Sequence, residues 1–230
     1  IDMNPSNAMA YHYRAMIYTK MKAFDKAIKD FNKVLEFDKN QPDIYYQRGI
    51  IHFYLRNFKE AAADYSIAIN NNPSSPNLYF NRANAYYNQK MYIESILDFD
   101  KTIEFDPRMA NAHLGLGNAN SALGNFKEAL KDFSKAITIN PKLFQAYIGR
   151  GNAFIKLRYY KKAQEDFTLA IEIKPDSPLG YLNRGIAFRS DNKFSDAARD
   201  FIEFLRMSPS HNTTTTQVKQ WLKKNNFPSE

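Results

Sequence analysis

Residues 110–143 read ANAHLGLGNANSALGNFKEALKDFSKAITINPKL, and this stretch decides the fold because the rest of the chain repeats its pattern. Moving the window by 34 residues in either direction brings residues equivalent to Gly117, Phe133 and Pro141 back into line. A fixed period of this length is typical of stacked helical hairpins, each of which buries its apolar face against its neighbours. The sequence therefore predicts a repeat architecture and not one globular core.

Six repeats follow one another without an insertion or deletion. They cover residues 8–41, 42–75, 76–109, 110–143, 144–177 and 178–211, and we number the positions within each repeat from 1 to 34. Residues 1–7 begin with IDMNP, which resembles the end of a repeat. We therefore interpret them as the remnant of an upstream repeat in a longer array.

Each repeat carries two apolar stripes with helical spacing. Positions 4, 8 and 11 form one stripe and positions 20, 24 and 27 the other. Position 8 holds only Gly or Ala, and a helical glycine costs about 1 kcal/mol relative to alanine. Its recurrence predicts a close approach between two antiparallel helices. Position 24 is aromatic throughout and is expected to fill the space between adjacent hairpins: Phe31, Tyr65, Phe99, Phe133, Phe167 and Phe201.

Prolines mark the ends and the beginnings of the expected helices. At position 32 proline prevents the second helix from continuing, and at position 1 it suits a helix start because its missing N–H group is not needed there. Repeat 1 has Lys39 at position 32, so we expect its second helix to run slightly further. The prolines are Pro73, Pro107, Pro141, Pro175 and Pro209 at position 32, and Pro42, Pro76 and Pro178 at position 1.

This set of residues resembles the tetratricopeptide repeat (TPR) family over residues 8–211. The small residue at position 8, Ala at 20, the aromatic residue at 24 and Pro at 32 are the signature of that family. The resemblance implies an all-α fold, a right-handed superhelical solenoid of six helix-turn-helix hairpins. It also implies that the first helices line a concave groove and that a helix caps the C-terminal end.

Residues 212–230 are expected to supply that capping helix and a tail. Val218, Trp221 and Leu222 would cover the last hairpin, while the lysines between them face water. The sequence Asn212-Thr213-Thr214 has the form of a glycosylation site, but we interpret it as the start of the helix.

The composition limits the function classes. The chain has 230 residues, of which 44% are hydrophobic, and it has no cysteine, so disulfides, thiolate metal sites and cysteine nucleophiles are excluded. The formal net charge is +8, but lysines alternate with Asp and Glu, which is typical of solvated helix faces. No apolar run has membrane-spanning length and no signal peptide opens the chain, so we assign it to the cytoplasm without membrane insertion.

Two charged positions recur with unusual regularity. Position 23 is Asp in every repeat and position 7 is Arg in five of the six. If the turn lies near position 15, these two positions stand at the same height on the two helices and can form bidentate, structural ion pairs. Repeat 4 has Leu116 at position 7, so Asp132 needs another donor. The expected pairs are Arg14 with Asp30, Arg48 with Asp64, Arg82 with Asp98, Arg150 with Asp166, and Arg184 with Asp200.

The resemblance places the groove at positions 2, 5, 6, 9, 12 and 13 of the first helices. In repeats 4 and 5 these positions are small, as at Gly115, Ser121, Ala122 and Gly149. In repeats 1 to 3 they are aromatic, and exposed aromatic residues in a concave surface are good anchor sites. The alternative is that these rings pack against neighbouring helices. They are Tyr13, Tyr46, Phe53, Tyr54, Phe80 and Tyr87.

Amide side chains also recur at the groove positions. An amide both donates and accepts, so a row of amides can hold the backbone of an extended peptide, as in the asparagine ladders of some TPR superhelices. The alternative is a solvated polar helix face. The residues concerned are Asn84, Asn118 and Asn152 at position 9, Asn81 and Asn183 at position 6, and also Gln47 and Asn88.

The sequence does not support two more specific hypotheses, binding of a chaperone carboxylate and catalysis. TPR co-chaperones hold the carboxylate of a heat-shock protein with a set of Lys, Asn and Arg residues that no three consecutive repeats provide here, since Phe80 stands where Lys is needed before Asn84. The four histidines are scattered, and GLGNAN at residues 115–120 lacks the third glycine and the preceding strand of a phosphate loop. We therefore expect no catalytic residue, no metal site and no cofactor.

The leading interpretation is a non-catalytic scaffold that binds a protein or peptide segment in the groove. One alternative is a helical repeat that binds nucleic acid, suggested by the basic charge. The expected groove carries only Lys20, Asp43, Lys156 and Arg189 as charged residues, which argues against it. Another alternative is a rigid spacer within a larger assembly.

Overall fold

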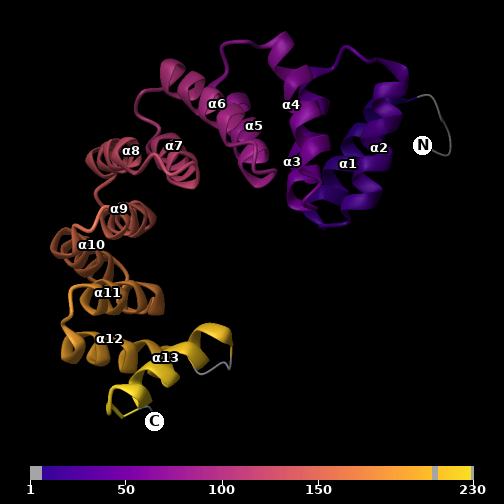
Figure 1. Ribbon diagram of the computed structural model, residues 1–230. Helices are drawn as coiled ribbons and strands as arrows, with labels where there is room; N and C mark the ends of the chain where they lie inside the picture. The colour runs from indigo at the N-terminus through magenta and orange to yellow at the C-terminus, as the bar shows by residue number, and fades with distance from the viewer. Residues whose placement is uncertain (1–6, 209–211, 229–230) are drawn as a thin grey trace. The chain divides into compact units, whose positions relative to one another are not determined.

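The computed structural model describes residues 7–208 and 212–228 (Figure 1). These residues contain thirteen helices and no strand, which confirms the all-α prediction. The chain divides into two compact units, Ile1–Ala112 and His113–Glu230, and each is described by itself. The upstream remnant expected at residues 1–7 lies, apart from Asn7, outside the described residues, as do Pro209 and His211.

The N-terminal unit consists of three antiparallel hairpins. Helices α1 and α2 form the first, α3 and α4 the second, and α5 and α6 the third. The hairpins stack because α2 packs against α3 and α4 packs against α5. The bounds are α1 Ala8–Lys20, α2 Phe24–Phe37, α3 Pro42–Tyr54, α4 Phe58–Asn71, α5 Pro76–Asn88 and α6 Tyr92–Phe105.

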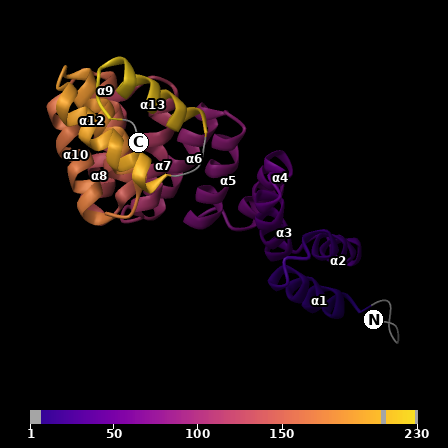
Figure 2. The ribbon, with the colours of Figure 1, turned by 90° about the horizontal axis from the view of Figure 1, so that it is seen from below.

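The C-terminal unit repeats this plan and ends in an additional helix. Helix α7, whose first residues belong to the N-terminal unit, precedes α8; α9 pairs with α10, and α11 with α12. Helix α13 packs against α12 (Figure 2). The bounds are α7 Ala110–Ala122, α8 Phe126–Ile139, α9 Phe144–Lys156, α10 Tyr160–Ile173, α11 Pro178–Ser190, α12 Phe194–Met207 and α13 Thr213–Lys224.

Every hairpin turns at position 15, where the backbone is left-handed. The N–H group of position 16 donates to the carbonyl of position 11, as from Ala23 to Tyr18 at 2.8 Å, and the N–H of position 15 donates to that of position 12. This Schellman motif satisfies the last carbonyls of each first helix. Only repeat 4 uses glycine there, Gly124 with φ of 83°; the other residues have φ between 57° and 63° and are Lys22, Arg56, Lys90, Arg158 and Asn192.

The expectation of a longer second helix in repeat 1 is wrong. Helix α2 ends at Phe37, which is position 30, the same position at which the other five second helices end. The carboxylate of Asp38 accepts hydrogen bonds from the backbone N–H of Asn40 at 2.8 Å and from the side chain of Gln41 at 3.0 Å. This local turn ends the helix without a proline.

The core of each unit is built on the aromatic side chains of position 24. All six are at most 1% exposed. The ring of Phe133 lies against two glycines, because a Cβ atom placed on Gly117 or Gly149 would come within 2.7 Å or 2.6 Å of it. The glycines of α7 and α9 thus leave the space that this ring fills.

Helix α13 covers the last hairpin as expected. Val218 and Leu222 are buried together with Phe201, and the ring of Trp221 meets that of Phe201 edge-on at 5.1 Å. Asn212 and Thr215 form a reciprocal capping box, each side chain accepting from the backbone N–H of the other. The prediction that residues 212–214 start a helix is therefore confirmed.

No helix within the described part of the chain is both long enough and apolar enough to span a bilayer.

Replacing Phe133 by Ala should lower the free energy of unfolding by about 3 to 5 kcal/mol, because the flanking glycines have no side chains that could fill the cavity. Urea unfolding followed by circular dichroism measures the loss. Phe194→Ala is the matched control, since that ring is 43% exposed and should cost much less. Equal losses for the two variants would contradict the packing role of Phe133.

Candidate partner-binding site

Arginine and aspartate come together inside the hairpins, at the two positions that the sequence singled out. In the first hairpin Arg14 Nε donates to Asp30 Oδ2 and Arg14 Nη2 donates to Asp30 Oδ1, both at 2.7 Å. The same two bonds recur at 2.6 to 2.9 Å in the pairs Arg48–Asp64, Arg82–Asp98, Arg150–Asp166 and Arg184–Asp200. All five carboxylates are buried.

Four of the five arginines also make a third hydrogen bond, which the sequence analysis missed. Nη1 donates to position 25 of the preceding repeat: Arg48 to Asn32 at 2.6 Å, and Arg82 to Ser66 at 2.9 Å. In the C-terminal unit the acceptors are Ser134 and Thr168. Each of these guanidinium groups therefore joins three helices. The sequence feature that could have predicted this third bond is the short polar residue at position 25 of the preceding repeat.

Repeat 4 has no arginine at position 7, and its aspartate bonds to a different side chain. Leu116 is buried, and Asn120 Nδ2 donates to Asp132 Oδ2 at 2.9 Å. Asn120 occupies position 11, which is aromatic or histidine in the other repeats. The carboxylate of Asp132, which is half-buried, thus receives an amide donor from the same first helix.

Arg150→Met should destabilise the protein by about 3 kcal/mol, because Asp166 stays buried without its cation, with some relief from water at the exposed edge of the site. Urea unfolding measures this loss. Lys131→Met is the control, since it breaks an ion pair with Glu128 whose side chains are 72% and 56% exposed and should change little. A similar effect of both substitutions would argue against a structural role for the arginine pairs.

The aromatic residues expected to line the groove of the N-terminal unit fall into two groups. Tyr13 and Tyr54 are 57% and 69% exposed. The other four are partly buried, and each contacts a ring of the second helix of its own hairpin at 5.3 to 6.1 Å between centroids. Each of these four rings therefore packs within its own hairpin, as the alternative interpretation expected, and is partly exposed at the same time. The contacts are Tyr46–Tyr65, Phe53–Phe58, Phe80–Phe99 and Tyr87–Tyr92.

Each of three amides of α5 donates one N–H group within the chain. Asn84 Nδ2 donates to the carbonyl of Phe80 at 2.7 Å, and Asn88 Nδ2 donates to that of Asn84 at 2.9 Å. Asn81 Nδ2 donates to the hydroxyl of Tyr46 at 3.3 Å. A peptide on this face would therefore meet the amide oxygen and the second N–H of each amide. Gln47 is half-buried.

The corresponding amides of the C-terminal unit differ in exposure. Asn152 is exposed and Asn118 is half-buried, but Asn183 is only 8% exposed and offers little contact surface, because α11 packs against both α9 and α10. Gly149, one of the small residues expected at a groove position, has a packing role, because its lack of a side chain accommodates the ring of Phe133. Asn84, the third amide expected at position 9, lies in the N-terminal unit.

Three buried polar atoms have no hydrogen-bond partner among the described residues: His12 Nε2, His52 Nδ1 and Ser121 Oγ. His52 lies at position 11, beside the Arg48–Asp64 pair. Burial lowers the pKa of His52 below its usual value, and the positive charge of Arg48 adds to this effect while Asp64 opposes it.

His52 should therefore make stability depend on pH. Because its folded-state pKa lies below the unfolded value of about 6.5, a falling pH protonates the unfolded chain first and stability is lost from that pH downward. His52→Phe, which introduces the residue found at position 11 of repeats 5 and 6, should remove this loss. The difference in unfolding free energy between the two proteins should be constant above pH 7 and should change below about pH 6.5. A difference that stays constant down to pH 5.5 would exclude this role.

Comparisons with known proteins address the fold. Family models described as "Tetratricopeptide repeat" match residues 8–41, 46–110, 110–143 and 144–177. No curated protein matches the sequence.

Several solved structures resemble the chain. The C-terminal part of a TPR repeat-containing protein from Cytophaga hutchinsonii has a TM-score of 0.77 and 19% identity, over 94% of this chain and 87% of its own. MamA from Desulfovibrio magneticus RS-1 has a TM-score of 0.71 and 18% identity, over 74% and 96%. YrrB, described as a TPR protein with an unusual peptide-binding site, has a TM-score of 0.66 and 20% identity, over 84% and 97%. At these identities the likeness shows the fold alone.

Proposed function

Because the chain belongs to the tetratricopeptide repeat family, we propose that it is a non-catalytic scaffold whose first-helix faces bind an extended segment of a partner protein. The face formed by α1, α3 and α5 of the N-terminal unit, here called the aromatic face, is the proposed contact surface. It carries the two exposed tyrosines, the four partly buried rings and the amides of α5.

The observation that carries the proposal is the fixed orientation of these groups. Each partly buried ring already contacts a ring of the second helix, so binding would cost little additional side-chain entropy. Asn84 and Asn88 each donate one N–H to the helix backbone, which leaves the amide oxygen and the second N–H for the backbone groups of an extended peptide.

Charge supports a protein partner over nucleic acid. Asn and aromatic residues predominate on the aromatic face, and its charged residues at the groove positions are Lys20 and Asp43. Nucleic-acid binding depends on several cations that neutralise phosphates. Location in the cytoplasm remains a prediction.

A random peptide library displayed on phage and selected on the purified protein tests the proposal. Peptides that bind the wild type should lose at least tenfold in affinity on Tyr13→Ala/Tyr54→Ala/Asn88→Ala, since loss of an anchor ring costs about 2 kcal/mol or more. Fluorescence anisotropy gives the dissociation constants. Tyr159→Ala/Leu169→Ala is the control, because those side chains are 54% and 41% exposed outside the aromatic face.

Circular dichroism checks that both variants stay folded. Failure to select any peptide, or equal binding by both variants, would refute the proposed function. Binding of single-stranded RNA that weakens steeply with salt concentration would instead favour the nucleic-acid alternative.

A further inference from the structure

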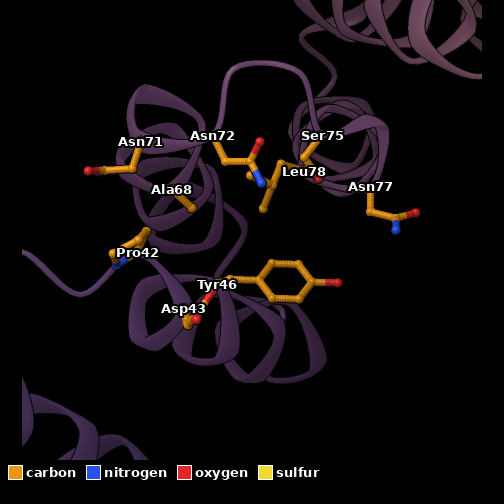
Figure 3. A pocket seen from close by; sticks show the side chains of 9 residues that line it. All are labelled: Pro42, Asp43, Tyr46, Ala68, Asn71, Asn72, Ser75, Asn77 and Leu78. Carbon is orange, nitrogen blue, oxygen red and sulfur yellow. The ribbon is translucent and has the colours of Figure 1, made fainter.

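A cavity of about 420 Å³ opens in the N-terminal unit between the start of α3, the end of α4 and the start of α5. Its size lies in the range of sites that hold a small ligand or a single side chain. Figure 3 shows Asp43 and Tyr46 on α3, with Asn72 and Leu78 across from them and Asn71 and Asn77 at opposite sides. We call it the Asp43 pocket.

The pocket is rich in hydrogen-bond acceptors. Asp43 contributes a carboxylate. Asn71 Nδ2 already donates to the carbonyl of Ile67 at 3.1 Å, which leaves its amide oxygen to accept. The side chains of Asn72 and Ser75 add further oxygens, while the hydroxyl of Tyr46 already accepts one hydrogen bond from Asn81. Among the lining residues there is no lysine, arginine or histidine.

Asp43 makes the pocket negative although the chain carries a net charge of +8. At physiological salt the screening length is about 8 Å, so distant lysines contribute little to the local potential. The last turn of α4 has no basic residue of its own. In the other repeats the residue equivalent to Asp43 is uncharged, namely Met9, Asn77, Asn111, Gln145 and Leu179.

The helix ends that border the pocket do not reverse this charge. Each helix end carries about half an elementary charge, positive at the N-terminus and negative at the C-terminus. The start of α5 and the end of α4 therefore offset each other. At the start of α3 the carboxylate of Asp43 itself faces the positive end, since it lies in the first turn. The full negative charge of the Asp43 carboxylate therefore makes the local electrostatic potential of the pocket negative.

We propose that the Asp43 pocket accepts an arginine side chain of the bound partner segment. The planar guanidinium has five donors, which match a carboxylate and several amide and hydroxyl oxygens. The ring of Tyr46 offers a face on which a guanidinium can stack. The inference rests on the proposed function, because the pocket includes Tyr46 of the aromatic face, and it specifies one side chain of the partner.

The first test uses a small probe, N-acetylarginine methylamide, titrated into the ¹⁵N-labelled protein. Backbone amide signals of Asp43, Tyr46 and Asn72 should shift in a saturable way, and N-acetylcitrulline methylamide, which has the same shape without the charge, should bind at least tenfold more weakly. Asp43→Asn should abolish the shifts. Asp25→Asn is the matched control and should not, because Asp25 is likewise an exposed carboxylate in the first turn of a helix of this unit.

The second test uses the peptides selected on the purified protein. They should contain an arginine whose replacement by citrulline weakens binding to the wild type and to Asp25→Asn at least tenfold, but hardly weakens binding to Asp43→Asn. Peptides that bind the aromatic face and show no such coupling, together with absent probe shifts, would overturn the arginine pocket and leave the proposed function intact. Probe shifts at the pocket without any peptide binding would overturn the proposed function and with it the assignment to a partner segment.

Discussion

A guanidinium group held by a buried carboxylate fixes the height of one helix against the other in five of the six hairpins. In four of these five the remaining nitrogen donates to the preceding second helix, so one side chain sets the geometry within a hairpin and between two hairpins. A buried carboxylate without a donor is costly, and this cost favours the aligned arrangement over a slipped one. The orientation of the first helices, and of everything they present, depends on this contact.

The aromatic face follows from the same constraint. With the helices held in register, a ring on a first helix meets a ring on the second, as Phe80 meets Phe99 at 5.9 Å. Each of these rings therefore packs against the second helix of its hairpin and is also partly exposed on the surface. Rings that already pack within the hairpin fit the proposed binding of an extended segment without large rearrangement, and Asp43 lines a pocket next to them.

The repeat period was sufficient to predict the helices, the turn at position 15, the buried rings and the partners of the arginines, because a fixed period states which positions meet. It could not predict how side chains compete for hydrogen bonds. Asn84 and Asn88 each donate one N–H to their own helix, and Asp38 ends α2 without a proline. Gly149 leaves space for the ring of Phe133 from the preceding hairpin. The Asp43 pocket also lay beyond prediction, since its walls come from three helices.

The left-handed turns have an electrostatic consequence. A side chain in this conformation is normally disfavoured and glycine preferred, yet four of the six turn residues are lysine or arginine: Lys22, Arg56, Lys90 and Arg158. Each sits directly after the C-terminus of a first helix, where a cation is attracted by the negative end of the helix dipole. This attraction offsets part of the backbone strain. Four of the 32 basic residues of the chain thus lie where their charge favours the chain's own helices, so the net positive charge is not by itself a sign of an anionic partner.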